Sequence, residues 1–152
     1  MLAKTKTTAR YTVKHLTIGG DITLEYIKPS AMAIDLTYQR NPEERRKKID
    51  AIKKDFSPYR LGVLEGCYRN TEGNEFFLID GAGRQLAMRE LDYDKPVLCL
   101  VHNHIKSVKE EAEWFLLLNP DNTAKVSPRQ KFKARIIAED SEALKMQRGC
   151  LA

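Results

Sequence analysis

The sequence predicts a single α+β domain, and three observations indicate it. Strand-like and helix-like stretches follow one another in an irregular order, unlike the regular alternation of a doubly wound sheet. Two strand-like stretches, at 61–68 and 75–79, flank a polar loop that contains Gly73, as in a hairpin. The 152 residues suffice for one domain with a core, and no internal repeat or second-domain boundary is evident. We therefore expect a disordered basic arm at 1–10, one domain at 11–140, and a C-terminal helix or frayed tail at 141–152.

Four elements are expected before residue 60. They are a short strand at 11–18, a strand at 22–27, a single helical turn at 30–35 and a helix from 41 to 56. Alternating apolar and polar residues predict the second strand. Asn41 offers a helix N-cap, Pro42 fits the first helical position, and Ile49 and Ile52 recur at helical spacing.

The second half of the chain predicts a further strand and four helices. The strand is expected at 96–101, and the helices at 81–91, at 107–118, from 127, and from 141 with fraying at Gly149. Ser107 and Glu110 form a capping-box pattern at the start of the second of these helices. That helix is apolar nearly all round from Trp114 to Leu118, so we expect it to be well buried.

Composition and charge narrow the class of protein. The net charge of +5 favours an anionic partner, of which nucleic acid is the commonest. No apolar run approaches the roughly 20 residues that a membrane span requires. Three widely spaced cysteines form no C-x-x-C pair, so neither a zinc site nor a disulfide framework is indicated. We expect a cytoplasmic protein with DNA or a nucleotide as partner and no membrane partner.

The turn from Asp80 to Arg84 is the strongest candidate site. It follows the apolar strand 76–79 and opens a helix, whose free N–H groups and positive dipole end attract anions. Gly81 and Gly83 allow backbone angles that other residues avoid and let a ligand approach closely. Arg84 can hold a phosphate with two parallel hydrogen bonds. The alternative is a plain structural turn, in which Asp80 caps the helix and Arg84 pairs with Asp80.

The order of several short motifs resembles the ParB/sulfiredoxin superfamily, and within it the short ParB-like proteins of phages and mobile elements. The motifs span about 22–135. They are Ile27-x-Pro29-Ser30, Tyr38-Gln39-Arg40, a helix ending in Phe56, Gly62-Val63-Leu64, the hairpin, Leu78-Ile79-Asp80-Gly81-Ala82-Gly83-Arg84 with Ala87, a strand at 97–101, and a helix ending in Leu118-Asn119. The resemblance implies a small mixed sheet with a central hairpin, packed by helices, and a helical C-terminal part.

The resemblance also implies a set of phosphate contacts. The Gly-x-x-Arg turn of the superfamily holds nucleotide phosphates, and a Gln-Arg pair and a later polar residue lie near it. The matching residues are Gly81, Ala82, Gly83 and Arg84, with Gln39, Arg40 and Asn119. Leu118 stands where partitioning members carry an acidic residue, so a metal-bound triphosphate would lose one ligand. The turn lacks the sulfiredoxin cysteine, which argues against reductase chemistry.

Two further groups of residues are candidates. The basic run Arg45, Arg46, Lys47 and Lys48 covers the polar side of a helix, either as a solvated face or as a contact for DNA phosphates. The acids Asp35, Glu65 and Asp80 could hold a metal for a nuclease in which Arg84 binds the scissile phosphate. His102 and His104 are expected to form a surface pair rather than a metal site.

The leading prediction is a domain that binds the phosphates of a nucleotide or nucleic acid and acts in DNA transactions of a phage or mobile element. A nucleotide with Mg²⁺ is the cofactor that this prediction suggests, and a homodimer is compatible with it. One alternative is an enzyme, either a metal-dependent nuclease or a nucleotide hydrolase, with Asp80 and Arg84 as catalytic residues. The other alternative is a non-catalytic interaction module that has kept the fold.

Overall fold

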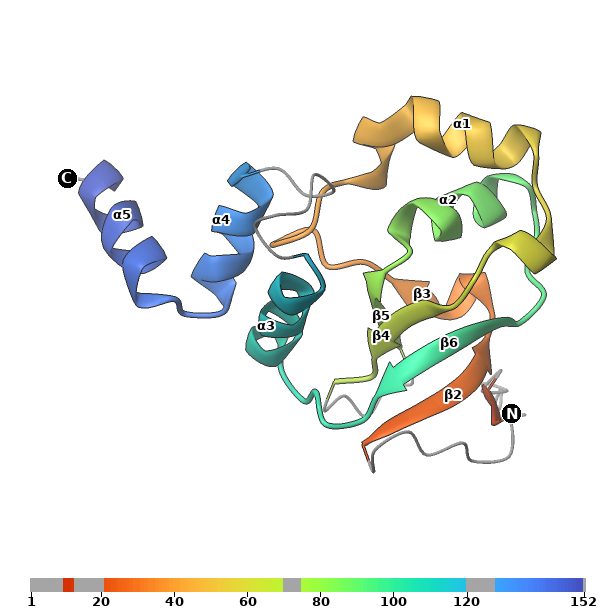
Figure 1. Cartoon of the computed structure of the whole chain (residues 1–152), viewed down its shortest axis with the longest axis horizontal. Helices are drawn as coiled ribbons and strands as arrows, with labels where there is room; N and C mark the ends of the chain where they lie inside the picture. The colour runs from red at the N-terminus through yellow and green to blue at the C-terminus, as the bar shows by residue number, and fades with distance from the viewer. Residues whose placement is uncertain (1–9, 13–20, 70–74, 120–127, 152) are drawn as a thin grey trace, which may run out of the picture.

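The computed structural model describes residues 10–12, 21–69, 75–119 and 128–151, which form one mixed sheet packed by helices (Figure 1). The described strands lie in the order β1-β2-β6-β4-β5-β3. Their bounds are β1 Arg10–Thr12, β2 Ile22–Ile27, β3 Met32–Ala33, β4 Leu64–Cys67, β5 Phe76–Asp80 and β6 Val97–His102. The β4–β5 hairpin is inside the sheet, antiparallel within itself, and β4 pairs in parallel with β6. The predicted α+β class with a central hairpin is therefore confirmed.

Helices α2 and α3 pack on opposite faces of the sheet. The bounds of the helices are α1 Arg46–Lys54, α2 Ala82–Glu90, α3 Val108–Leu118, α4 Pro128–Ile137 and α5 Ser141–Leu151, with 3-10 turns at Pro29–Ala31, Pro42–Arg45 and Pro58–Arg60. Along β5, Phe76 and Leu78 belong to a core cluster with Met88 of α2, whereas Ile79 belongs to a cluster with Phe115 of α3. Because neighbouring strand residues point to opposite faces, these clusters lie on opposite sides of the sheet.

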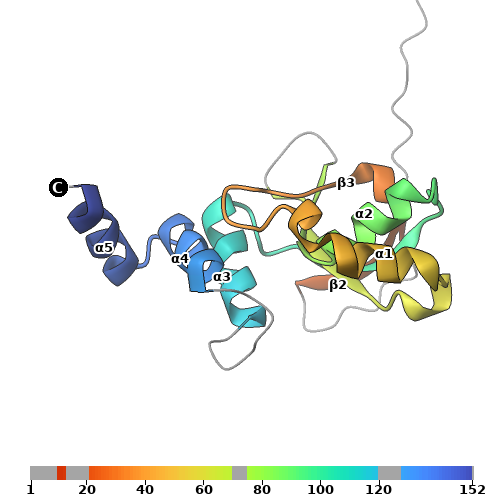
Figure 2. The same ribbon diagram turned by 90° about the horizontal axis from the view of Figure 1, so that it is seen from above.

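The two ends of the chain differ from the predictions made for them. Of the expected basic arm at 1–10 the structure describes only Arg10, and of the predicted strand at 11–18 only Tyr11 and Thr12; these three residues form β1. At the other end, α4 and α5 lead away from the sheet beyond α3 (Figures 1 and 2). The helix α5 continues through Gly149, so the predicted fraying there was wrong. Among the described residues, no helix combines the length and apolar composition needed to cross a membrane.

Two other local predictions were wrong for tertiary reasons. The expected helical turn at 30–35 is a 3-10 turn at Pro29–Ala31 followed by the short strand β3. This strand exists because Met32 pairs in parallel with Phe76 of β5, a long-range contact that local patterns do not contain. Helix α3 is not buried all round, since Leu117 is 69% exposed.

Candidate phosphate-binding cleft

The turn between β5 and α2 depends on Gly81. Its φ angle is 111°, in a region that residues with a side chain rarely adopt. A Cβ on Gly81 would lie 2.7 Å from Cγ of the buried Leu64. Gly83 does not use the backbone freedom of glycine, because it lies inside α2 and has no positive φ. Gly81 therefore makes the turn, and Gly83 leaves the start of the helix without a side chain.

The N-terminus of α2 has no side-chain cap. Gly81 is the N-cap residue, and it has no side chain that could accept a hydrogen bond from the first turn. The N–H groups of the first helical residues, Ala82, Gly83 and Arg84, have no intrahelical acceptor by the geometry of any α-helix. Asp80 does not cap this helix, contrary to the structural alternative. Backbone donors at the positive end of the helix dipole thus remain available to an anion.

The residues that carry these donors line a cleft of about 840 Å³, which we call the α2 cleft. It brings together almost all the residues that the sequence singled out. Its lining includes Gln39, Arg40, Arg45, Arg46, Lys47, Lys48, Asp80, Gly81, Ala82, Gly83, Arg84 and Asn119, with Ile49, Ile52, Ile79 and Phe115 as apolar wall. The cleft lies where α1, the start of α2, the end of α3 and the segment before α1 meet.

The cationic side chains of the cleft differ in whether a carboxylate of the protein already pairs with them. Arg46 donates to Glu90 at 2.7 Å and also pairs with Glu43, while Lys53 reaches the same Glu90 carboxylate at 2.9 Å. Hydrogen bonds from Lys53 and Arg46 lower the pKa of Glu90, so this group ties α1 to α2. By contrast, Lys47 and Lys48 are exposed and make no ion pair with the described residues. These two lysines are therefore the cations most available to a ligand.

Arg84 is committed to the protein. Its Nη1 donates to the carbonyl oxygens of Leu61, at 2.6 Å, and Val63, at 3.3 Å, and its Nη2 lies 3.1 Å from the Asp80 carboxylate. The arginine thereby fixes the chain that enters β4 against the glycine turn. This pairing is the one that the structural alternative predicts, and it means that Arg84 must keep or exchange these contacts to bind a phosphate.

Gln39 and Asn119 line the cleft, and their side chains also donate hydrogen bonds to neighbouring parts of the protein. The Gln39 amide donates to the Leu78 carbonyl of β5 at 2.5 Å and to the Tyr38 hydroxyl at 2.9 Å. Asn119, the C-cap residue of α3, donates from Nδ2 to the Phe115 carbonyl at 2.8 Å. Each side chain therefore has a structural role that the sequence did not reveal.

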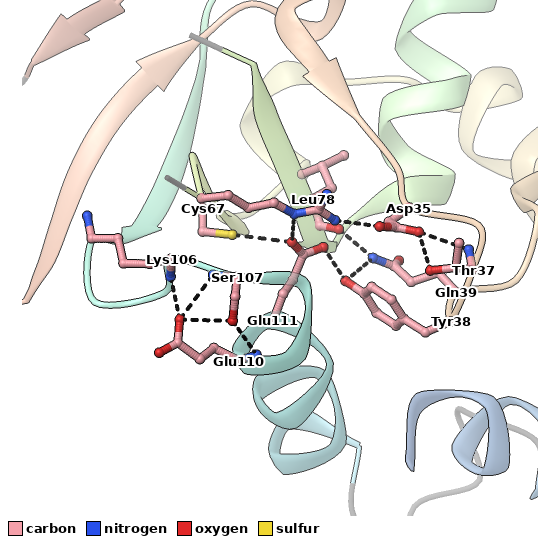
Figure 3. Close-up of polar contacts among 11 residues, drawn as sticks. Asp35, Thr37, Tyr38, Gln39, Cys67, Leu78, Lys106, Ser107, Glu110 and Glu111 are labelled. Carbon is pink, nitrogen blue, oxygen red and sulfur yellow. Dashed lines mark hydrogen bonds and ion pairs between the residues drawn. The ribbon is translucent and has the colours of Figure 1, made fainter. Parts of the chain in front are cut away.

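A buried polar network lies behind Gln39, and the sequence did not predict it (Figure 3). Glu111 is fully buried and accepts hydrogen bonds from the Tyr38 hydroxyl and from Nε of Arg69, both at 2.5 Å. Arg69 also pairs with Asp35 at 2.6 Å. Burial opposes the ionisation of Asp35, but hydrogen bonds from Thr37 and Arg69 outweigh it and lower its pKa. The available sequence signal was weak: Glu111 lies one helical turn before Phe115, on the same side of the helix as that apolar residue.

The candidate metal ligands do not converge on one point. Among the described residues, no three His, Cys, Asp or Glu side chains are grouped so that they could hold a metal ion. Glu65 and Asp80 are register partners on β4 and β5, but Asp35 belongs to the network around Arg69. The surface histidine pair was also wrong, because His102 is only 1% exposed and hydrogen bonds to Glu65 at 2.9 Å. His104 is exposed, as expected.

Comparison with known proteins identifies the fold. No family model matches the chain, and no curated protein matches it. Solved structures do match, among them the pNOB8-like ParB N-domain, with a TM-score of 0.51, 13% identity, 86% of this chain covered and 46% of the other. The C2221 form of the same kind of domain matches with a TM-score of 0.50, 16% identity and coverages of 84% and 48%. The chain thus spans less than half the length of these structures, and its fold is that of the ParB N-domain.

Proposed function

We propose that this protein binds the phosphate groups of a nucleotide or a nucleic acid in the α2 cleft and acts in DNA transactions. The observation that carries the proposal is the meeting of two anion-binding features in one cleft. One is the uncapped, glycine-containing start of α2, and the other is the cationic surface that begins before α1. Neither feature alone is specific for a phosphate ligand, but residues of both line the same cleft.

The charge balance of the cleft supports an anionic ligand. Six cationic residues line it against two acidic ones, Glu44 and Asp80. Both acids are paired, Glu44 with Arg40 at 3.3 Å and Asp80 with Arg84. Lys47 and Lys48 add charge without an internal partner among the described residues, so they are expected to act on phosphate oxygens.

The size and apolar wall of the cleft support a ligand larger than a lone phosphate. Small-molecule sites typically occupy about 300–1,000 Å³ and combine apolar walls with a few polar groups. The α2 cleft, at about 840 Å³, has such a wall in Ile49, Ile52 and Phe115. A base or sugar can lie against this wall while the phosphates meet the start of α2.

The DNA-related part of the proposal rests on fold analogy, which is weaker support than site geometry. The likeness to ParB N-domains concerns the fold, at 13% and 16% identity. A role in a phage or mobile element, a cytoplasmic location and a homodimer belong to the same proposal and need their own measurements.

Calorimetric titration with each nucleoside triphosphate, with and without Mg²⁺, and with a short DNA duplex tests the proposal. The double variant Lys47→Ala/Lys48→Ala is expected to weaken binding about tenfold or more at low salt and to reduce the salt dependence. Lys54→Ala is the matched control, because Lys54 lies on α1 but does not line the cleft. Absence of binding to every nucleotide and to DNA would refute the proposal. A loss of affinity in Lys54→Ala as large as that in Lys47→Ala/Lys48→Ala would also refute it.

The nuclease alternative has no additional support in the geometry. Its two assigned residues, Asp80 and Arg84, form a pair that already has a structural role. A plasmid-nicking assay with Mg²⁺ or Mn²⁺ decides this alternative. Cleavage that disappears in Asp80→Ala would revive it.

A further inference from the structure

The buried carboxylate of Glu111 links helix α3 to the segment that carries Gln39 and Arg40. Its Oε1 accepts from the Tyr38 hydroxyl, and its Oε2 accepts from Nε of Arg69. A charge at 0% exposure is costly unless it is paired and hydrogen-bonded, and both oxygens satisfy that condition. Glu111 is therefore held in one position and holds its two partners in return.

The segment 35–40 has few backbone partners, and side chains fix it: the buried Tyr38 ring packs edge-on against Phe115, and the polar network adds further attachments. It forms a turn and irregular chain between β3 and the helix start at Pro42, and it lies outside the sheet ladder. The network attaches it at two points. Tyr38 binds Glu111 directly, and Arg69 bridges Glu111 to Asp35, whose carboxylate in turn accepts from the Thr37 N–H at 2.9 Å.

This segment delivers residues to the α2 cleft. Beyond Tyr38, the Gln39 amide is anchored on the Leu78 carbonyl, and Gln39 and Arg40 both line the cleft. The same stripe of α3 continues from Glu111 to Phe115 and Asn119, four and eight residues later, and these also line the cleft. Figure 3 shows Glu111 reaching from its helix toward Tyr38, Gln39 and Cys67.

We propose that Glu111 is a positioning residue, which acts through Arg69 and Tyr38 to fix Gln39 and Arg40 at the cleft and so raises the affinity of a site that it does not touch. This inference rests on the proposed function for its effect on affinity. Its effect on the order of the 35–40 segment is independent of any ligand. The competing explanation is that the contacts of Glu111 with Tyr38 and Arg69 stabilise the fold and have no effect on the cleft.

The test compares Glu111→Gln with Glu110→Gln, the same chemical change at the neighbouring residue. Glu110 belongs to the exposed capping box of α3 and does not line the cleft. Two quantities are measured at a temperature where every variant is folded: the affinity for inorganic pyrophosphate, by calorimetry, and amide deuterium exchange in peptides that cover 35–41. Tyr38→Phe, which removes only the hydroxyl, serves as a second variant if Glu111→Gln does not fold.

The expected result is a roughly tenfold loss of pyrophosphate affinity in Glu111→Gln and Tyr38→Phe, the size of one lost hydrogen bond to a charged group. Exchange in 35–41 is expected to rise in both and to stay unchanged in Glu110→Gln. If the wild-type protein binds pyrophosphate and the variants bind it equally well with unchanged exchange, the inference is wrong. If the wild-type protein binds neither pyrophosphate nor any nucleotide or DNA, the proposed function fails, and the exchange comparison alone decides whether Glu111 positions the segment.

Discussion

Replacing Gly81 by alanine should destabilise the protein far more than the same replacement of Gly83. At Gly81, with φ at 111°, a side chain incurs about 1–3 kcal/mol of backbone strain. The new methyl group would also lie 2.7 Å from Cγ of Leu64, a branch carbon of a fully buried side chain that cannot easily move. Overpacking of this kind adds about 1–3 kcal/mol. We expect a total loss of about 2–6 kcal/mol in the free energy of unfolding.

At Gly83 the structure predicts no loss of stability on replacement by alanine. This residue is helical, and a Cβ would meet only Cγ1 of Ile49, at 4.0 Å, which is ordinary van der Waals contact. Alanine is the better helix former by about 1 kcal/mol in a helix interior. Near the first turn the gain is smaller, so we expect Gly83→Ala to leave stability unchanged or to raise it by about 0.5 kcal/mol.

Urea unfolding, followed by far-UV circular dichroism and by the fluorescence of Trp114, the only tryptophan in the chain, measures both values. The reasoning is refuted if Gly81→Ala lies within about 1 kcal/mol of the wild type, or if Gly83→Ala is the more harmful change. The pair also separates fold from site, because the methyl group of Gly83→Ala lies at the start of α2 in the cleft. That variant is expected to bind phosphate ligands more weakly while remaining fully stable.

Three further predictions concern stability and reactivity. The pKa of Asp35 is lowered from its usual 3.8, so its ionised form stabilises the fold above pH 3.8, and this stability is lost as the pH falls through the lowered pKa. In Asp35→Asn, the urea midpoint should therefore depend less on pH in the acid range. Burial raises the pKa of Cys67 and Cys99 to about 12, so at pH 8 a thiol reagent should modify them only when the protein unfolds. Counting the modified thiols with and without denaturant measures this. Phe115→Ala should cost about 3–5 kcal/mol and Leu117→Ala less than about 1 kcal/mol in the free energy of unfolding, since only the first side chain is buried; equal losses would contradict the packing of α3.

The sequence predicted most elements because their signals are local. Asn41 caps its helix start with a hydrogen bond from the Glu43 N–H, and Ser107 with Glu110 forms the expected capping box. The alternation at 22–27 gave β2. Such features involve residues a few positions apart, whose interactions hardly depend on the remainder of the fold. The hairpin and the glycine turn, being continuous in sequence, were predictable for the same reason.

What a side chain does inside the cleft was decided by tertiary structure. The sequence identified Arg84 and Gln39 as candidate ligands, yet their partners are backbone carbonyls of Leu61, 23 residues away, and Leu78, 39 residues away. The Glu111–Arg69 pair joins residues 42 positions apart.

By itself the sequence determined the order of the strands and helices other than β3, the net positive charge, and a glycine turn placed between a buried strand and a helix. Only the tertiary structure decided that this turn, the basic helix and the end of α3 share one cleft, and which of its polar groups are already engaged. The physical reason is that caps, turns and periodicity act over a few residues. The partners of a buried charge or amide are fixed only when distant segments pack, because each such group must find its hydrogen bonds among whatever the fold brings to it.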